Sequence, residues 1–483
     1  MALLRVSNLR ASYGAEAQLL SGISFKLSAG EHLGLSGASG AGKSTLLRLL
    51  SGLAVRESGL TWQGDVKAFG EHDILRSGPL ADGRIGLVTE EPKAGLHPQR
   101  TLAESWRRFG LPPVAVGLLA EFGLENPQSI LDRYPYQISG GEAQRYRLAT
   151  ALARNPRVLL LESPTASLDS VSTQRVLEVL EKRLASGLGI IHVSHDTDLL
   201  DRIATRRFHL QDGSLMPPSP AVRLSPKPQK PSQTKLFSAK HVAVVVAEKQ
   251  APLVDDVSLH IKKSEILGLA GRSGSGKTSL GRAIARLLPA TGSAGFSESE
   301  KAYTLATHAY SAPDQRVQYL WQESREALNP KLTVKRTLSD ALAAGRGRLS
   351  NGYKNAAELW EAVGMNLASL PRAAISLSTG EMLRLALARA IAVSPELLIA
   401  DEILASLDAT TRCGIVDLLR SQQRRTGLGI LWIGHDLRQL QEVSDRIAVM
   451  DEGKIVETLS AEDFIVSARS LAARQLSAAA GLT

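Results

Sequence analysis

The stretch GASGAGKS spans Gly37 to Ser44, and GRSGSGKT spans Gly271 to Thr278. Both fit the pattern G-x-x-x-x-G-K-[ST], in which glycines let backbone N–H groups surround phosphates. The lysine of this pattern reaches the outer phosphates, and the last hydroxyl is a ligand for Mg²⁺. The two copies lie 234 positions apart, close to half of the 483-residue chain. Such self-similarity predicts two homologous nucleotide-binding domains on one polypeptide.

The segments around each loop predict an α/β fold. Alternating apolar residues at 4–6 and 23–27 indicate antiparallel strands near the start of the chain. Short apolar runs that resemble buried strands follow downstream, at 158–161 and 190–193 in the first half and at 397–400 and 430–433 in the second. Helix-forming segments separate these runs, and each phosphate loop precedes one, at its positive N-terminus. This alternation predicts a parallel α/β core in each half.

A proline-rich stretch separates the two halves. Residues 217–235, PPSPAVRLSPKPQKPSQTK, contain six prolines and four basic residues without an acidic one. Such a composition predicts an extended, semi-rigid linker. We therefore expect domains at residues 1–216 and 236–483. The final stretch, 460–483, alternates Ala and Leu with polar residues, which predicts one or two short amphipathic helices at a domain edge or flexible end.

Composition and charge argue against several classes of protein. Cys413 is the single cysteine, which excludes an internal disulfide, and no Cys/His cluster has the spacing of metal ligands. The net charge of +9 would suit nucleic acid, but the chain has no run of five or six like charges. No apolar stretch approaches the roughly 18 residues that span a bilayer, and no secretory signal opens the chain. A role at a membrane is therefore expected to come through a partner.

Further motifs recur in the same order in each half. ISGGEAQR at 138–145 and LSTGEMLR at 377–384 resemble the signature motif of ABC ATPases. SLD at 167–169 and at 406–408 resembles the D-loop, and His195 and His435 resemble the switch histidines of that family. The resemblance implies ATP and Mg²⁺ as ligands. It also implies two tandem ABC-type P-loop NTPase domains, each with a RecA-like α/β core, an antiparallel β subdomain and a small helical subdomain.

The resemblance also implies the residues of each site. ATP contacts fall on Tyr13, Gly37, Ser39, Gly40, Gly42, Lys43, Ser44, Thr45 and His195, on Gly271, Ser273, Gly274, Gly276, Lys277, Thr278 and Ser279, and on the signature residues Ser139, Gly140, Gly141, Ser378 and Gly380. The magnesium side falls on Ser44, Glu90, Glu162, Thr278, Gln322 and Asp401. Glu402 stands where the family keeps its general base, supported by His435, Gln322 and Lys277.

The two sites are not equally complete. In this family each ATP lies between the phosphate loop of one domain and the signature of the other, so the site of Lys43 pairs with the second signature. Aligned through Pro164 and Thr165, Ser163 falls on the catalytic glutamate, which serine cannot replace as a base. Three further departures fall on the same composite site: Glu162 for the magnesium-side aspartate, Glu90 for the expected glutamine, and Thr379 for a signature glycine. We predict that this site binds ATP but hydrolyses it poorly, while the site of Glu402 turns over.

Two alternatives to this asymmetry remain open. The departures can be drift that leaves both sites active. Alternatively, the alignment can slide by one residue, so that Glu162 is the catalytic carboxylate and Leu161 stands at the magnesium position. One difference favours ATP binding at the first site instead, because Tyr13 resembles the aromatic residue that stacks on adenine, whereas the second half has Val245 or Val246 there. Ordinary strand packing is the alternative role for Tyr13.

The neighbourhoods of Glu90 and Gln322 narrow the type of ABC protein. TEEPKAGLHPQRTLAES at 89–105 and WQESREALNPKLTVKRTL at 321–338 resemble the Q-loop regions of peptide/nickel import ATPases of the dipeptide/oligopeptide type. The resemblance implies two integral-membrane permease subunits, a periplasmic or extracellular solute-binding protein, and a peripheral position on the cytoplasmic face of the inner membrane. The solute stays open among peptide, nickel, metallophore and opine. Leu96, Trp106, Leu328 and Trp360 lie in segments that either line a permease groove or belong to the core.

Two other classes compete with an importer. A soluble tandem ABC ATPase that acts on ribosomes or nucleic acid usually has a long charged linker and two catalytic glutamates. The short proline-rich linker and Ser163 argue against it, so no nucleic-acid partner is expected. An exporter cassette is the third option, and no fused membrane-spanning segment supports it.

Overall fold

The computed structural model divides into two compact units, Met1–Val222 and Arg223–Thr483, which are described separately. It describes residues 2–14, 18–38, 40–70, 72–80, 82–93, 95–111, 116–218, 232–246, 251–297, 303–305, 314–345, 353–404, 407 and 409–482. Ser39, the D-loop residues Ser406 and Asp408, and residues 219–231 of the expected linker lie outside these ranges.

The first unit opens with an antiparallel sheet of strand order β2-β1-β4-β5. Its strands are β1 (Ala2–Tyr13), β2 (Leu20–Ser28), β4 (Leu60–Ala68) and β5 (His72–Asp73). Leu4 and Val6 are buried while Arg5 is exposed, as the period-two pattern predicts. The register shifts after Val6, where Asn8 adopts a positive φ of 46° and its N–H bonds Ser24. The expected antiparallel strands are therefore confirmed.

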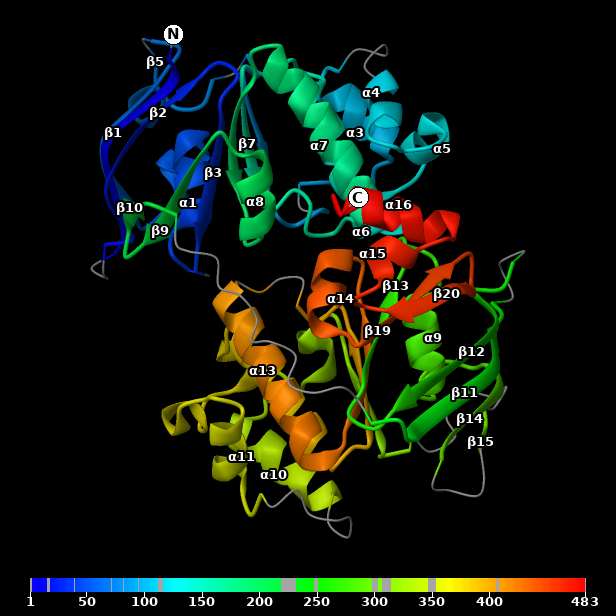
Figure 1. The fold of residues 1–483 in the computed structure, drawn as a ribbon. Helices are drawn as coiled ribbons and strands as arrows, with labels where there is room; N and C mark the ends of the chain where they lie inside the picture. The colour runs from blue at the N-terminus through cyan, green and yellow to red at the C-terminus, as the bar shows by residue number, and fades with distance from the viewer. Residues whose placement is uncertain are drawn as a thin grey trace. The chain divides into compact units, whose positions relative to one another are not determined.

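The second sheet of this unit is mostly parallel, with order β10-β9-β3-β8-β7-β6. Its strands are β3 (His32–Gly37), β6 (Ile85–Val88), β7 (Val158–Glu162), β8 (Gly189–Val193), β9 (Arg206–Gln211) and β10 (Ser214–Met216). Every residue of β3 and β8 is buried, as expected for strands covered on both faces. Helix α1 (Lys43–Leu50) lies between the two sheets, and α7 (Ser170–Ala185) covers the opposite face of the parallel sheet (Figure 1).

The remaining helices of this unit are short. They are η1 (Leu53–Arg56), α2 (Ile74–Ser77), α3 (Leu102–Arg108), α4 (Gly117–Glu121), α5 (Pro127–Leu131), η3 (Pro135–Gln137), α6 (Gly140–Leu152) and α8 (Thr197–Ile203). The segment from α3 to α6 forms the small helical part, and its core contains Trp106 and Tyr146, whose rings lie 6.0 Å apart. Trp106 is only 3% exposed, so it belongs to the core.

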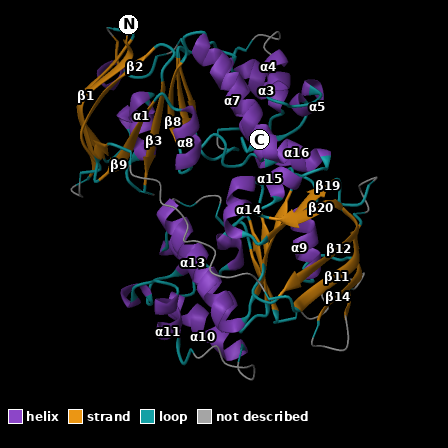
Figure 2. Cartoon of the chain, in the orientation of Figure 1, coloured by secondary structure: helices purple, strands orange, loops and turns teal. Residues whose placement is uncertain are grey.

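The second unit repeats this plan. Its antiparallel sheet has order β12-β11-β14-β15 and its larger sheet has order β16-β17-β18-β13-β19-β20. The strands are β11 (Lys235–Val244), β12 (Val254–Lys262), β13 (Ile266–Ala270), β14 (Thr291–Phe296), β15 (Tyr303–Thr304), β16 (Val317–Leu320), β17 (Leu397–Asp401), β18 (Gly429–Ile433), β19 (Arg446–Asp451) and β20 (Lys454–Ser460). Figure 2 shows the strands of both units in orange and their helices in purple. The α/β architecture predicted from the repeated loops is thus confirmed in both halves.

The helices of the second unit include a C-terminal pair that has no counterpart among the described residues of the first unit. They are α9 (Lys277–Ile284), η4 (Ser324–Ala327), α10 (Val334–Ala344), α11 (Ala356–Ala362), η5 (Leu367–Ser369), η6 (Ala374–Ser376), α12 (Thr379–Ala392), α13 (Ala409–Thr426), α14 (Leu437–Val443), α15 (Phe464–Ser467) and α16 (Leu471–Ala479). Trp360 is fully buried. The predicted tail helices are α15 and α16, and buried Phe464 and Leu476 join them to the main core.

Candidate functional site

Each phosphate loop has the backbone conformation that its glycines permit. Gly42 and Gly276 are the N-caps of α1 and α9, with φ of 98° and 101°. A Cβ at Gly276 would lie 2.2 Å from the Leu253 carbonyl oxygen, and one at Gly271 would lie 2.3 Å from that of Met450. A side chain at either position would therefore force the backbone apart. The glycines hold each loop at the N-terminus of a helix, where backbone N–H groups favour an anion.

The lysine of each loop lies over the loop itself. Lys43 Nζ donates to the carbonyls of Gly37 and Ala38 at 2.8 and 2.6 Å. Lys277 Nζ donates to those of Gly271 and Arg272, both at 2.8 Å. Both side chains are at least nine-tenths buried. Each loop therefore places one ammonium charge beside the space that its backbone encloses.

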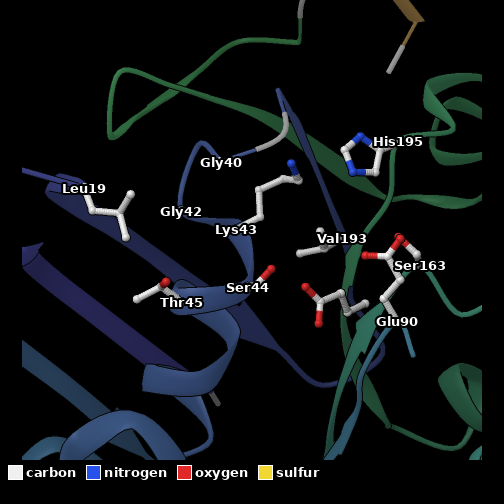
Figure 3. Close-up of a pocket in the computed structure, with 11 residues that line it drawn as sticks. Leu19, Gly40, Gly42, Lys43, Ser44, Thr45, Glu90, Ser163, Val193 and His195 are labelled. Atoms are coloured by element: carbon white, nitrogen blue, oxygen red, sulfur yellow. The ribbon is translucent and has the colours of Figure 1, made fainter. Parts of the chain in front are cut away.

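A pocket of about 180 Å³ in the first unit brings the predicted residues together. Its lining consists of Leu19, Gly40, Gly42, Lys43, Ser44, Thr45, Glu90, Glu162, Ser163, Val193 and His195. Figure 3 shows Lys43, Ser44, Ser163 and His195 around this space. Desolvation and the charge of Glu162 raise the pKa of Glu90 above its ordinary value, although Lys43 opposes the rise. Two carboxylates thus share one wall of the pocket.

In the second unit, Asp401 ends β17 beside the phosphate loop. Thr278 Oγ1 donates to Asp401 Oδ1 at 3.2 Å, and the Tyr319 hydroxyl donates to Oδ2 at 2.5 Å. Burial and the charge of Glu402 raise the pKa of Asp401, while the bonds from Tyr319 and Thr278 oppose the rise. Tyr319 was not among the predicted residues. The sequence signal that could have predicted its place at the site is its position on β16, three residues before Gln322.

Glu402 follows Asp401 and lies between two polar partners. Gln322 Nε2 donates to Glu402 Oε2 at 3.0 Å, and His435 Nδ1 lies 3.4 Å from Oε1. Burial lowers the pKa of His435, but the hydrogen bond and charge of Glu402 outweigh it, so the pKa stands above its ordinary value. A carboxylate held between an amide and an imidazole is oriented to accept a proton from a water molecule.

Ser163 takes the place of Glu402 in the first unit. Glu162 pairs with Val193 across β7 and β8, as Asp401 pairs with Ile433 across β17 and β18. The Ser163 N–H bonds the Val193 carbonyl at 2.8 Å, and the Glu402 N–H bonds that of Ile433 at 3.0 Å. Both residues have positive φ, 44° and 49°. The strand pairing therefore matches Glu162 with Asp401 and Ser163 with Glu402, and does not support a register shifted by one residue.

The donor set beside each phosphate loop fits Mg²⁺. Magnesium prefers hard oxygen ligands, usually a carboxylate with phosphate oxygens and water. The neighbouring Thr278 hydroxyl and Asp401 carboxylate supply such oxygens in the second unit. Ser44 and Glu162 line the first pocket in the corresponding positions. These residues would hold the ion when it is bound with a nucleotide.

Comparison with known proteins identifies the family. A sequence profile described as ABC transporter matches residues 20–166 and 254–405, which is more than half of the chain. The chain belongs to the ABC transporter family. The resemblance drawn from the phosphate loops and signatures is confirmed, and the protein is an ATPase of this family.

Two curated relatives match nearly the whole ABC chain. This chain is 27% identical over 507 residues to the uncharacterized ABC transporter ATP-binding protein YejF of Escherichia coli K12. The alignment covers 94% of this chain and 95% of YejF. The chain is 28% identical over 535 residues to the glutathione import ATP-binding protein GsiA of the same strain, covering 94% and 85%. A solved RNase-L Inhibitor aligns with TM-score 0.69 over 98% of this chain and 93% of its own, but at 19% identity it shows the fold alone.

The two ABC signatures form the same helix start. Ser139 is the N-cap of α6 and Ser378 is the N-cap of α12, and each completes a capping box with the glutamate three residues on. Gly140 and Thr379 both occupy the first helical position. A Cβ at Gly140 would meet no atom closer than 3.7 Å. Outside its own helix, the position in the first signature therefore has room for a Cβ such as Thr379 carries in the second.

The aromatic difference between the ABC domains has a defined position. The Leu19 N–H bonds the Ala11 carbonyl, and the Leu253 N–H bonds the Val244 carbonyl, each at 2.8 Å. Tyr13 and Val246 each lie two residues after the acceptor, so they occupy equivalent positions in the two domains. The Tyr13 hydroxyl donates to Glu57 at 3.1 Å, which directs its ring beside Thr45 of α1. The matching residue of the second domain, Val246, has no aromatic ring.

Proposed function

We propose that this chain is the ATP-hydrolysing subunit of an importer, working with two integral-membrane permease subunits and, through them, a solute-binding protein. The name of the relative GsiA, a glutathione import ATP-binding protein, supports this assignment. None of the described helices is both long and apolar enough to cross a membrane. The proposed location is peripheral, on the cytoplasmic face of the inner membrane, with the permeases providing the attachment.

We propose further that hydrolysis occurs at the site of the second phosphate loop. The observation that carries this proposal is Glu402, bonded to Gln322 and paired with His435. In this role Glu402 accepts a proton from the attacking water, and His435 helps to place that water against the outer phosphate. Lys277 and the loop N–H groups hold the phosphates, while Thr278 and Asp401 face the metal. When bound, Mg²⁺ neutralises charge that develops on the phosphate oxygens.

The first phosphate loop is proposed to bind ATP without turning it over rapidly. Its pocket keeps Lys43, Ser44 and His195, but Ser163 replaces the carboxylate base. By the family's arrangement, Ser378 and Gly380 would serve this nucleotide, and Ser139, Gly140 and Gly141 would serve the other. Among the solutes consistent with the sequence, a peptide-like one is favoured, because GsiA is named for import of glutathione.

A pull-down tests the importer proposal. The tagged chain is purified from membranes in mild detergent, and the copurified proteins are identified by mass spectrometry. Two multi-span permeases are expected, and the solute-binding protein that works with them then leads to the solute. Recovery of ribosomal proteins without a permease would overturn the transport proposal and leave the ATPase assignment intact.

A further inference from the structure

Arg147 of α6 binds the loop that carries Glu90. Its guanidinium donates to the carbonyl of Thr89 at 3.2 Å, to the carbonyl of Glu91 at 2.6 Å, and to Thr89 Oγ1 at 2.9 Å. These acceptors belong to the two neighbours of Glu90. The planar fork of an arginine can satisfy several such acceptors at once, which a lysine cannot do as well. The backbone on both sides of Glu90 is therefore tied to the signature helix.

The second domain has no arginine at the matching position. Alignment of Ser139 with Ser378 puts Ala386, which is 2% exposed, in the place of Arg147. Helix α12 has two arginines: Arg384 donates to the Val363 carbonyl, and Arg389 donates to the Ala327 carbonyl, five residues beyond Gln322. The Gln322 side chain is instead held by Glu402. Each signature helix thus holds its loop, but at a different point.

The first domain cannot use the bond that the second domain uses. Ser163 has a shorter side chain than Glu402, and among the described residues no hydrogen bond joins Glu90 to Ser163. Glu90 and Glu162 both line the pocket, so two carboxyl groups lie at the same site. Like charges repel, so an unrestrained loop would carry Glu90 away from the pocket. The three bonds from Arg147 oppose this movement.

We infer that Arg147 is a positioning residue of the first nucleotide site, where it keeps the Glu90 loop against the pocket in place of the bond between Gln322 and Glu402. The inference rests on the proposed nucleotide site of the first domain. It deepens that proposal by naming what fixes the magnesium side of a site that lacks the catalytic carboxylate. The bonds from Arg147 also couple the loop that carries Glu90 to α6. Movement of the signature motif, with which α6 begins, would therefore move this loop.

The test uses the full chain with Lys277→Ala, which disables the second phosphate loop so that binding reports the first. Affinity for a slowly hydrolysed ATP analogue is measured with Mg²⁺ and with EDTA. Mg²⁺ is expected to increase the affinity of the parent for the analogue. Arg147→Ala should make this increase smaller by roughly threefold to tenfold, as loss of a few hydrogen bonds predicts. Millisecond hydrogen–deuterium exchange of residues 85–93 is expected to rise. Arg147→Lys should give a partial loss, and it serves as the test if the alanine variant is misfolded.

Arg154→Ala is the matched control. Arg147 and Arg154 line the same pocket of about 350 Å³, but Arg154 donates to the Phe109 carbonyl and not to the Glu90 loop. The control should leave both readouts unchanged. Equal losses in the two variants, or no change in Arg147→Ala, would overturn the inference. If the parent fails to bind the nucleotide at all, the proposed first site fails, and the exchange of residues 85–93 still decides the role of Arg147.

Discussion

Ser163 and Glu402 occupy one and the same backbone position in the two halves of this ABC ATPase. Each follows the acidic end of a buried strand, each has a positive φ near 45°, and each bonds the last residue of the neighbouring strand through its N–H. A non-glycine residue with positive φ is uncommon, so its presence at both positions marks a shared turn. The two halves therefore differ in the side chain on this turn and not in the turn itself.

Replacing the two residues should have unequal effects. Glu402→Gln is expected to lower ATP hydrolysis by about 10²–10⁴-fold, because the base is lost while the amide keeps the shape. Ser163→Ala should change the rate less than about twofold, since this hydroxyl is no base. Steady-state phosphate release with saturating Mg²⁺ and ATP measures both. Comparable losses would show that the sites share the chemistry.

The pKa of His435 should depend on Glu402. Burial alone lowers this pKa, and the hydrogen bond and charge of Glu402 raise it above the ordinary value. Glu402→Gln removes the opposing negative charge and leaves burial, so the pKa of His435 should fall. A pH titration of the histidine Cε1–H signals by NMR measures the change, with His435→Gln used to assign the signal. An unchanged pKa would mean that another group sets it.

A buried histidine pair should make the first domain sensitive to acid. His32 and His192 stack at 5.4 Å, with Nε2 and Nδ1 3.3 Å apart. Burial lowers the pKa of His32 from 6.5 to about 4. Between these values the unfolded state binds the additional proton, so stability is lost as pH falls from about 6.5 to about 4, by up to about 1.4 kcal/mol per pH unit.

The second domain provides the control for this effect. Ile266 stands at the position of His32, because each pairs with the first isoleucine of the adjacent strand. His32→Ile should therefore remove the contribution of His32 to the acid sensitivity, while His192 keeps the contribution that its own burial causes. Urea unfolding of the full chain at several pH values, followed by hydrogen exchange of residues 32–37 and 266–270, separates the domains. Equal acid loss in both segments of the parent would contradict the assignment.

Tyr13 should strengthen adenine nucleotide binding in the first domain. Aromatic stacking contributes about 0.5–1.5 kcal/mol beyond buried area, so Tyr13→Ala should weaken binding by about twofold to twelvefold. Tyr13→Phe keeps the ring and loses the bond to Glu57, so it should retain most of the affinity. Titration in the Lys277→Ala background measures both variants. If Tyr13→Ala and Tyr13→Phe lose affinity equally, the effect comes from the bond to Glu57 and not from stacking on adenine.

Much of the fold was predictable because its signals are local. The phosphate loops depend on glycines that adopt positive φ within eight residues, and the buried strands depend on short apolar runs. The tail helices followed from amphipathic spacing, but their docking did not. Arg438 holds the Ala480 and Gly481 carbonyls from another helix, and nothing near residue 480 predicts that contact.

The sequence alone determined that there are two nucleotide-binding domains, that their motifs follow one order, and that several motif residues differ between the two halves. These conclusions depend on residue identity and spacing along the chain. Only the tertiary structure decided that Glu162 matches Asp401 and not Glu402. The pairing of β7 with β8 had to be known before the two domains could be aligned at this point. The tertiary structure also decided that Arg147 holds the loop of Glu90, since hydrogen bonds between residues more than fifty positions apart form only when the chain has folded.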